Sequence, residues 1–332
     1  MSNEIKKNEF NNLMQIIEEA RANALKAVNK ELILMYWKVG EYLHHLTLNS
    51  SFGDKVIDDV ARFIKESNPM LKGFNKRGLY RMKQFYETYV DDEFVSPLVT
   101  QISWSNHLVI LSGSKSKEER HFYLSMCIAE KYTKRELERQ IDSLYYQRYM
   151  ISKNQSFQSN LSKDIRSSIL DTYVLDFLNL PKHFNESDLR KEIVSNLKDF
   201  ILEFGKDFAF LGEEYKIQVG GQDFYIDLLF YHRKLKCLVP IELKTDKFKP
   251  EYVGQINFYL EALDRDVKKD YENPSVGILL CTLKDDTIVE YAISRSISQM
   301  LVSDYTLELP DKKMLENRLK EITNIALGKE EY

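Results

Sequence analysis

Two neighbouring apolar segments with strand-like patterns stand out in the second half of the chain. The segment from Gln222 to Lys244 reads QDFYIDLLFYHRKLKCLVPIELK, which predicts two strands joined by a short basic turn. A near-continuous apolar strand is typical of burial on both faces of a sheet. Asp227, Glu242 and Lys244 interrupt these apolar runs. Because a buried carboxylate costs free energy unless it is paired or binds a cation, this segment is the first candidate for a functional site.

A hairpin of these two strands would bring the three charged side chains together. Alternate residues of a strand point to the same face, so Glu242 and Lys244 share a face that Ile241 and Leu243 do not. A tight turn then brings Asp227 alongside them. Two carboxylates and an ammonium group suit metal-assisted hydrolysis of a phosphodiester. The alternative is a strand pair with a solvated charged face, which fits Glu242 and Lys244 but not an aspartate between large apolar neighbours.

The first half of the chain shows helical spacing instead. Apolar residues recur every three or four positions from about residue 9 to residue 48, which predicts two successive helices. Later segments predict a short helix ending before Pro69, a helix capped by Asn75, and a helix that starts with the capping box Thr133–Glu136. His107 enters an apolar helix, where a lone histidine is typical of a hydrogen-bonded core residue.

The two helices on either side of Asn75 carry a local excess of positive charge. The stretch from Arg62 to Lys83 has seven basic residues and one acid, a balance of +6 in a chain whose net charge is −4. The helix–turn–helix layout resembles a DNA reader whose second helix enters the major groove. The candidate nucleic-acid-binding residues are Lys76, Arg77, Arg81 and Lys83. The alternative is an ordinary solvated helix face.

The C-terminal half has the element order of an α/β layer fold. The predicted elements are a helix over 165–180, a helix from the cap Ser187 to Gly205, a strand over 215–219, the turn Gly220-Gly221, the two site strands, a helix over 251–264, strands over 276–281 and 306–309, and a terminal helix. Pro240 cannot donate to a strand ladder, which predicts a sheet edge or a bulge. The polar stretch over 151–164 is the predicted linker, so we expect domains at 1–155 and 156–332.

Composition narrows the function classes further. A length of 332 residues with 43% hydrophobic content predicts a two-domain globular protein. We find no apolar run long enough to span a bilayer and no signal-peptide core, so we expect a cytoplasmic protein with no membrane partner. The three cysteines are far apart in apolar stretches, which indicates core residues and no metal or disulfide pattern. The net charge of −4 means that nucleic-acid binding needs a local basic patch.

Long local segments also resemble a known family. GKDFAFLGEEYKIQVGGQDFYIDLLFYHRKLKCLVPIELK, FKPEYVGQINFYLEALD, ENPSVGILLC, GFNKRGLYRMKQFYETY and ISWSNHLVIL look like the bacterial DUF1016 (YhcG-type) proteins, and Asp…Glu-x-Lys is the pattern of the PD-(D/E)xK nuclease superfamily. The resemblance implies a restriction-endonuclease-like α/β domain, with a central mixed sheet flanked by helices, behind an all-α N-terminal domain. It implies Asp227, Glu242 and Lys244 as active-site residues. The residue before Asp227 is Ile226, where the superfamily's name has proline.

Three further polar residues are candidates near this site. Superfamily relatives often carry a polar residue at the position of Gln255, which could position a phosphate or a water. Glu186 lies on the apolar side of its helix by the 3.6-residue period and could supply a third carboxylate to the metal. Glu192 lies more than about 90° away from that stripe and ranks lower. The expected cofactor is Mg²⁺ or Mn²⁺, because hard cations prefer carboxylate oxygens.

These features lead to a main functional hypothesis and an alternative from a different class. The main hypothesis is a Mg²⁺-dependent endonuclease that hydrolyses DNA, with two carboxylates on the metal and a lysine assisting the attacking water. The alternative is a catalytically silent DNA-binding or assembly module that keeps the nuclease fold. RNA as the substrate, a homodimer, and association with other nucleic-acid-processing proteins all stay open. The sequence has no phosphate-binding GxxxxGK[ST] loop, so any motor would be another chain.

Overall fold

The computed structural model of the chain describes residues 2–48, 55–92, 95, 98–154, 163–296 and 298–326. These residues form two compact units, Met1–Glu138 and Arg139–Tyr332. The predicted boundary near residue 155 stays a prediction, since residues 155–162 of the predicted linker lie outside the described part.

The first unit is helical, as the spacing predicted. Its elements are α1 (Ser2–Leu48), α2 (Lys55–Ser67), α3 (Lys76–Tyr89), the 3₁₀ turn η1 (Val99–Gln101), α4 (Trp104–Gly113), α5 (Lys117–Glu130) and the start of α6 (Lys134–Asp142). Gly40 lets α1 approach α3 closely, because a Cβ there would lie 2.2 Å from the carbonyl oxygen of Met82. His107 is fully buried and its Nε2 lies 2.8 Å from the Val99 carbonyl oxygen, which confirms the predicted core histidine.

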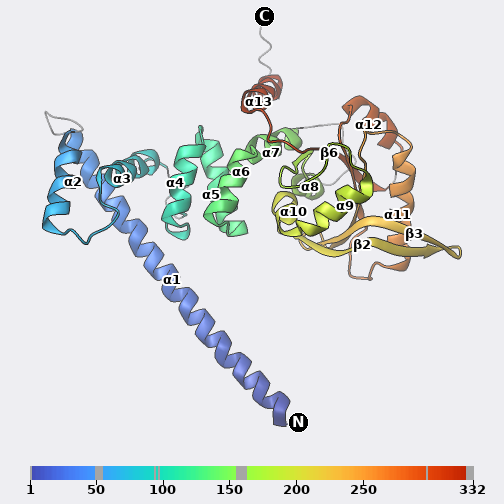
Figure 1. Cartoon of the computed structure of the whole chain (residues 1–332), viewed down its shortest axis with the longest axis horizontal. Coiled ribbons are helices and arrows are strands. Elements are labelled where there is room, and N and C mark those ends of the chain that lie inside the picture. The colour runs from blue at the N-terminus through green and yellow to red at the C-terminus, as the bar shows by residue number, and fades with distance from the viewer. Residues whose placement is uncertain are drawn as a thin grey trace, which may run out of the picture. The chain divides into compact units, whose positions relative to one another are not determined.

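The helix α1 corrects the prediction of two successive N-terminal helices. It is continuous, and Figure 1 shows its N-terminal half extending away from α2, α3 and α4 of the same unit. Residues 10–28 of this half are all exposed. The exposed apolar side chains are Phe10, Leu13, Met14, Ile16, Ile17, Leu25, Val28 and Leu32. The spacing predicted the helix but not that these apolar residues would be exposed in the described part of the chain.

The second unit is built on a mixed sheet, which confirms the predicted fold class. Its strands are β1 (Thr172–Val174), β2 (Phe208–Val219), β3 (Gln222–His232), β4 (Cys237–Leu243), β5 (Val276–Cys281) and β6 (Gln299–Thr306), in the order β1-β6-β5-β4-β3-β2. The pairs β2–β3 and β3–β4 are antiparallel, and the others are parallel. Gly220 and Gly221 have φ of 61° and 77°, which suits the tight turn between β2 and β3.

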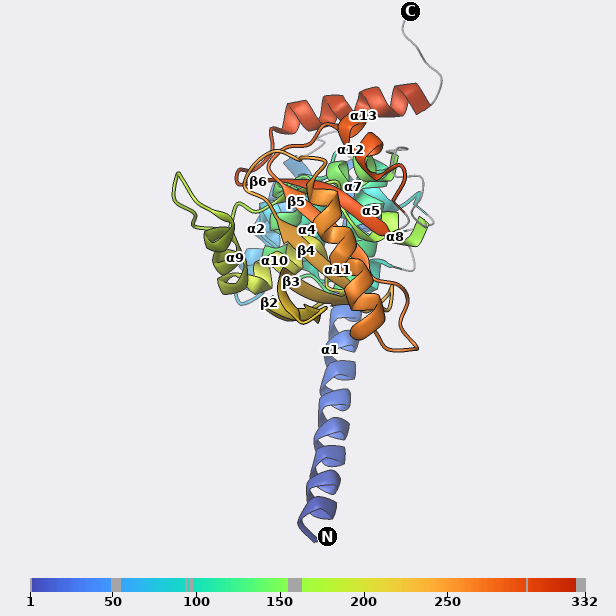
Figure 2. The same cartoon turned by 90° about the vertical axis from the view of Figure 1, so that its right-hand side faces the viewer.

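Helices cover both faces of this sheet (Figures 1 and 2). The helices of this unit are the end of α6, α7 (Tyr145–Asn154), α8 (Lys163–Ser168), α9 (Glu186–Ser195), α10 (Leu197–Phe204), α11 (Tyr252–Asp266), α12 (Asp286–Ile293) and α13 (Lys312–Ala326), of which, in the described residues, α13 packs on α7 and not on the sheet. Phe200 of α10 stacks on Phe230 of β3, whereas Leu229 packs in a cluster with Leu263 of α11. Because adjacent strand residues point to opposite faces, α10 and α11 lie on opposite sides of β3.

Several local predictions in this unit were wrong. The predicted helix over 165–180 is instead the short α8 followed by strand β1, and the last strand ends at Thr306 rather than beginning there. The helix predicted from Ser187 begins at Glu186, with Asn185 as its cap, and breaks at Asn196.

Pro240 is also placed differently from the prediction, because β4 lies between β3 and β5 in the sheet interior. The ladder from β4 to β5 begins at Ile241, directly after the proline. The missing N–H therefore falls where pairing to β5 has not yet started.

Other expectations about the chain agree with the structure. The three cysteines are free and buried, as core residues should be. Asn75 accepts a hydrogen bond from the Gly78 N–H, and Thr133 and Glu136 form the predicted capping box. Among the described residues, we find no helix whose length and hydropathy would allow it to cross a membrane.

A buried ion network ties α10 to the rest of the unit. Glu203 of α10 has no exposed surface and accepts hydrogen bonds from Arg139, Arg148 and the Val174 N–H. Burial alone would raise the pKa of Glu203, but the two guanidinium groups outweigh it and hold that pKa below its usual value. Since α10 directly follows α9, this network helps to fix α9 over the end of β4.

Replacing Glu203 with Ala should destabilise the second unit strongly. It would leave the buried Arg148 and the half-buried Arg139 without their shared carboxylate, and breaking a buried ion pair from one side costs about 3–5 kcal/mol. Urea unfolding measures the loss. The control is Glu261→Ala, which removes an exposed partner of Arg265 on α11 and should cost less than about 1 kcal/mol. Equal losses for the two variants would contradict the assigned role of Glu203.

Candidate functional site

The hairpin β3–β4 brings Asp227 and Glu242 together, as the pattern predicted. Leu228 pairs with Ile241, so the next antiparallel step puts Asp227 opposite Glu242. The Leu243 N–H donates to Asp227 Oδ2 at 3.0 Å, which closes this contact across the two strands. The Glu242 side chain is 4% exposed, and its Oε2 is buried without a hydrogen-bond partner in the described part of the chain. Such an atom needs a cation or a proton.

Lys244 lies at the end of β4 and contacts two carboxylates. Its Nζ donates to Glu242 Oε1 at 2.9 Å and lies 3.4 Å from Glu186 Oε1. The ammonium group also lies 5.1 Å from the centre of the Tyr252 ring on α11. Lys244 is buried, so this charge depends on its neighbours. The structure therefore joins all three predicted strand residues in one cluster.

Glu186 reaches the cluster because α9 begins there. Asn185 caps the helix by accepting from the Asp188 N–H, and Asp188 accepts from the Asn185 N–H in return. This capping box directs the first turn of α9 toward the end of β4. The lower-ranked Glu192 instead accepts from the Asn179 N–H and the Asn196 side chain. The structure thus brings Glu186, and not Glu192, to Lys244.

Arg190 is a residue of this cluster that the sequence analysis missed. Its Nη1 donates to Asp227 Oδ1 at 2.9 Å, and its Nη2 donates to Glu214 Oε1 at 2.6 Å. It lies one helical turn after Glu186, so both side chains project from the same face of α9. That spacing, next to the buried Leu189, was the signal available in the sequence. A charged residue beside an apolar stripe is common, so the spacing alone could not identify its partners.

The proximity of these groups shifts the pKa of Glu242 and of Lys244. Burial and, after it, the negative charge of Asp227 raise the pKa of Glu242 to about 7, although Lys244 partly offsets both. Burial lowers the pKa of Lys244, but the carboxylates of Glu242 and Glu186 outweigh burial and raise it overall. Lys244 therefore stays charged at neutral pH while Glu242 exchanges its proton there.

Gln255 lies in a second layer beside the carboxylates. Its Nε2 donates to the Tyr259 hydroxyl at 3.0 Å, and that hydroxyl donates to the Tyr225 carbonyl oxygen at 2.9 Å. Burial raises the pKa of Tyr259, and the charges of Glu242 and Asp227 add to the rise. Gln255 is thus connected to the cluster through Tyr259, and no direct bond joins it to a carboxylate in the described structure.

The donor set fits a hard divalent cation held by few protein ligands. Among the described residues, no three His, Cys, Asp or Glu side chains are already arranged around a common metal position. The Lys244 ammonium group forms ion pairs with both Glu242 and Glu186, and the Arg190 guanidinium group forms an ion pair with Asp227. Mg²⁺ commonly binds one or two carboxylates and keeps several waters, which Asp227 and the free oxygen of Glu242 can supply.

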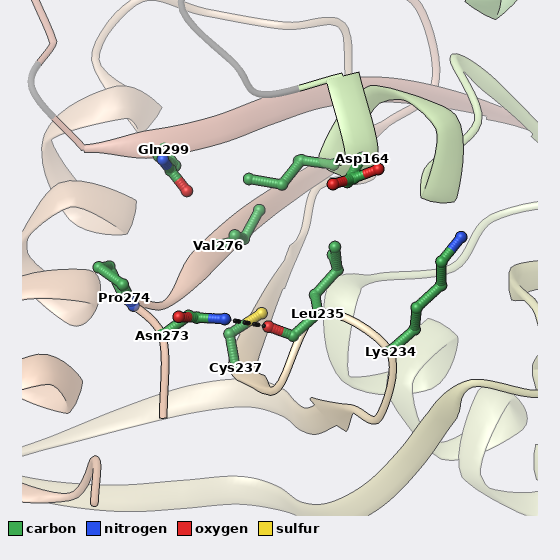
Figure 3. A pocket seen from close by; sticks show the side chains of 9 residues that line it. Asp164, Lys234, Leu235, Cys237, Asn273, Pro274, Val276 and Gln299 are labelled. Carbon is green, nitrogen blue, oxygen red and sulfur yellow. Dashed lines mark hydrogen bonds between the residues drawn. The ribbon is translucent and has the colours of Figure 1, made fainter. Parts of the chain in front are cut away.

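A separate cavity lies at the opposite end of the strands. It has a volume of about 360 Å³, and Cys237, Val276 and Gln299 line it at the first residues of β4, β5 and β6 (Figure 3). A hydrogen bond of 2.8 Å from Asn273 Nδ2 to the Leu235 carbonyl oxygen borders it. Glu242 is near the far end of β4, so this cavity is not part of the carboxylate cluster.

The predicted nucleic-acid-binding residues lie on α3 in the first unit. Three of the four have a polar partner nearby: Lys76 Nζ contacts Asp58 Oδ2 at 2.8 Å, Lys83 Nζ contacts Glu87 Oε1 at 3.6 Å, and Arg81 Nη1 donates to Gln84 Oε1 at 3.0 Å. Arg77 is exposed and pairs with no acid among the described residues. Because Asp58 and Glu87 flank the basic residues, the local positive charge is smaller than the +6 of residues 62–83 alone.

Comparison with known proteins assigns both halves of the chain. Residues 166–320 match the model of the "YhcG PDDEXK nuclease domain", and residues 12–148 match that of the "DUF1016 N-terminal domain". A curated relative from Escherichia coli (strain K12), described as "Putative nuclease YhcG", is 28% identical over 92% of this chain and 92% of its own length. The nuclease-domain match spans β1 to β6 and includes Asp227, Glu242 and Lys244.

Two solved structures share a weaker similarity. One is described as a repair endonuclease from Pyrococcus abyssi, with a TM-score of 0.28 and 18% identity over 40% of this chain and 50% of that chain. The other is described as EndoMS in apo form, with a TM-score of 0.26 and 17% identity over 40% of this chain and 49% of that chain. The matched region spans about half the length of each.

Without metal, the protein should lose stability as Glu242 ionises. The unfolded carboxyl ionises near its ordinary pKa of 4.5, whereas the folded one holds its proton to about 7. The folded state therefore binds more protons between these values, and its stability falls as pH rises through that window. In thermal unfolding with a chelator present, the stability of Glu242→Gln relative to the wild type should increase as pH rises through this window. Above the window the variant should stay the more stable of the two. A constant difference at all pH values would refute the shifted pKa.

Proposed function

The chain belongs to the family that joins a DUF1016 N-terminal domain to a YhcG PDDEXK nuclease domain, and we propose that its second unit is a divalent-metal-dependent endonuclease acting on DNA. The observation that carries this proposal is the pair Asp227 and Glu242, side by side on β3 and β4, in which Asp227 is half-buried and Glu242 is buried with its Oε2 unpaired in the described structure. A strand pair selected for stability alone has no use for that arrangement.

Asp227 and Glu242 would hold Mg²⁺ or Mn²⁺, with Glu186 as a further carboxylate at the same end of the sheet. When bound, the cation would neutralise charge on the scissile phosphate and lower the pKa of a water. The carboxyl of Glu242 has its pKa raised to about 7, which suits a group that gives up its proton when a cation arrives at neutral pH. Asp227 is oriented by the Leu243 N–H and by Arg190.

Lys244 would act on the reacting atoms. Its ammonium group is buried beside Glu242 and keeps its charge, because the surrounding carboxylates raise its pKa. From this position it would orient the attacking water and counter the negative charge that builds on the phosphate oxygens. Gln255, through Tyr259, would support the same edge of the site by hydrogen bonding.

The first unit would supply the affinity for DNA. Arg77 and Arg81 lie one turn apart on α3, and Arg77 is exposed. A helix whose exposed face carries arginines can contact phosphates or enter the major groove. The competing function is a silent DNA-binding module, in which the carboxylate cluster would serve no reaction. Binding and cutting measured on the same variants distinguish these functions.

Replacing Lys244 with Ala should separate catalysis from binding. The lysine is proposed to act mainly in the transition state, so DNA affinity should stay close to wild type. Single-turnover cleavage with Mg²⁺ should slow by roughly 10²–10³-fold, the usual loss for one electrostatic group. A filter-binding titration and a quench experiment on the same DNA measure the two quantities.

The matched control for this variant is Lys249→Ala. Lys249 also lies over the Tyr252 ring, at 5.6 Å, but it pairs with Asp246 and makes no contact with Glu242 in the described structure. The Lys249→Ala variant should therefore cleave DNA at the wild-type rate. If the wild type cuts no duplex, single-stranded or branched DNA with Mg²⁺, and Lys244→Ala weakens binding, the silent module is the better assignment.

Replacing Arg77 and Arg81 with Ala should weaken DNA binding and leave the chemical step intact. Removing one arginine–phosphate pair should reduce the slope of log affinity against log salt by about 1. Affinity measured over a salt series gives that slope, and cleavage at saturating DNA gives the chemistry. Lys134→Ala serves as the control, because Lys134 is an exposed lysine paired with Glu138 on α6. An unchanged salt slope in the double variant would exclude α3 as the DNA-binding surface.

A further inference from the structure

Arg190 is the one buried arginine that contacts the proposed metal ligands in the described structure. Its guanidinium group bonds Asp227 at 2.9 Å and Glu214 at 2.6 Å, and its Nε lies 3.9 Å from Glu213 Oε2. The arginine side chain is 11% exposed. An arginine cannot lose its proton in a protein, so a permanent positive charge lies against Asp227 before any metal arrives.

The backbone around Glu214 suggests that this contact is built into the fold. Glu214 has φ of 43°, in the left-handed region that a residue with a side chain rarely adopts. The neighbouring pairs Glu213–Leu228 and Tyr215–Ile226 place Glu214 beside Asp227 on the adjacent strand. Strained residues persist where the surrounding structure holds them, often at functional sites. Here the strain accompanies a carboxylate that is aimed at Arg190.

Both oxygens of Asp227 are already engaged. Oδ1 accepts from Arg190 and Oδ2 accepts from the Leu243 N–H. A carboxylate oxygen has a second lone pair, so a divalent cation can still bind Asp227, but only close to the guanidinium group. The rest of the cluster has an excess of acid, because Arg190 and Lys244 face Asp227, Glu242, Glu186, Glu213 and Glu214.

We propose that Arg190 neutralises Asp227 while the site is empty and, by repelling the cation, sets the metal affinity of the site. This inference rests on the proposed function of Asp227 as a metal ligand. Arg190 thereby substitutes for the cation while the site is empty and prevents repulsion from separating Asp227 and Glu214. The bound cation is then held more weakly than the carboxylates alone would hold it.

The competing interpretation is that Arg190 only stabilises the fold. The two interpretations predict opposite changes in metal affinity. If Arg190 is only a structural support, its removal loosens Asp227 and weakens metal binding. If Arg190 repels the cation, its removal strengthens metal binding even though the metal-free protein becomes less stable.

The test is Mn²⁺ binding to the full chain without DNA, followed by electron paramagnetic resonance of the free ion. Arg190→Gln should bind Mn²⁺ roughly tenfold more tightly than the wild type, a ratio that corresponds to about 1.4 kcal/mol. Arg190→Lys keeps the charge and should stay near the wild-type affinity. The control Arg265→Gln removes an exposed arginine of α11 and should change nothing. Unchanged or weaker binding by Arg190→Gln would overturn the proposal.

A second variant keeps the test decisive if Arg190→Gln does not fold without metal. Glu214→Gln leaves Arg190 with Asp227 as its closest acidic partner and should weaken Mn²⁺ binding. Thermal unfolding adds a readout independent of activity, since Mn²⁺ should raise the Tm of Arg190→Gln by more than that of the wild type. If the wild type and every variant fail to bind Mn²⁺, the proposed metal site itself is refuted. If the wild type binds Mn²⁺ and neither Arg190→Gln nor Glu214→Gln changes the affinity, only the role of Arg190 is refuted.

Discussion

The placement of a buried carboxylate directly beside a half-buried one is the constraint on which the second unit depends. Asp227 and Glu242 lie on neighbouring strands, and Glu242 is almost fully removed from water. Unpaired, such a pair would be strongly destabilising. Two positively charged side chains from different elements compensate this pair: Lys244 at the end of β4 and Arg190 on α9. Each cation takes one carboxylate of the pair and a second one from α9 or β2.

This constraint explains why α9 has to be fixed so firmly over the strand ends. The capping box at Asn185 directs its first turn, and the break at Asn196 turns the chain into α10. There Glu203 binds Arg139 and Arg148, and Phe200 stacks on Phe230. The network around Glu203 carries no chemistry of its own. Its consequence is that Glu186 and Arg190 arrive at the strand ends in a defined position.

The sequence predicted the parts of the site that depend on local pattern. Asp227, Glu242 and Lys244 could be found because period-two alternation and a tight turn determine which strand residues meet. Arg190 and Glu214 could not be found in this way, since their contacts join α9, β2 and β3, and no local period encodes those contacts. For the same reason β1 was missed. It is a three-residue strand that exists only because β6 pairs with it, so helical propensity gave the wrong answer there.

Local rules also failed where tertiary pairing satisfies a backbone group by another route. Pro240 predicted a sheet edge, because its nitrogen cannot donate. In the structure the strand is central, and the proline precedes the first residue paired to β5. With Pro240 at this position, Ile241 and Leu243 pack into the core. Glu242 and Lys244 take the alternate positions, which face the charged cluster. The position of Pro240 is therefore compatible with the strand register that the candidate site requires. A shift of β4 by one residue would place Ile241 and Leu243 where the carboxylate of Glu242 and the ammonium group of Lys244 now meet.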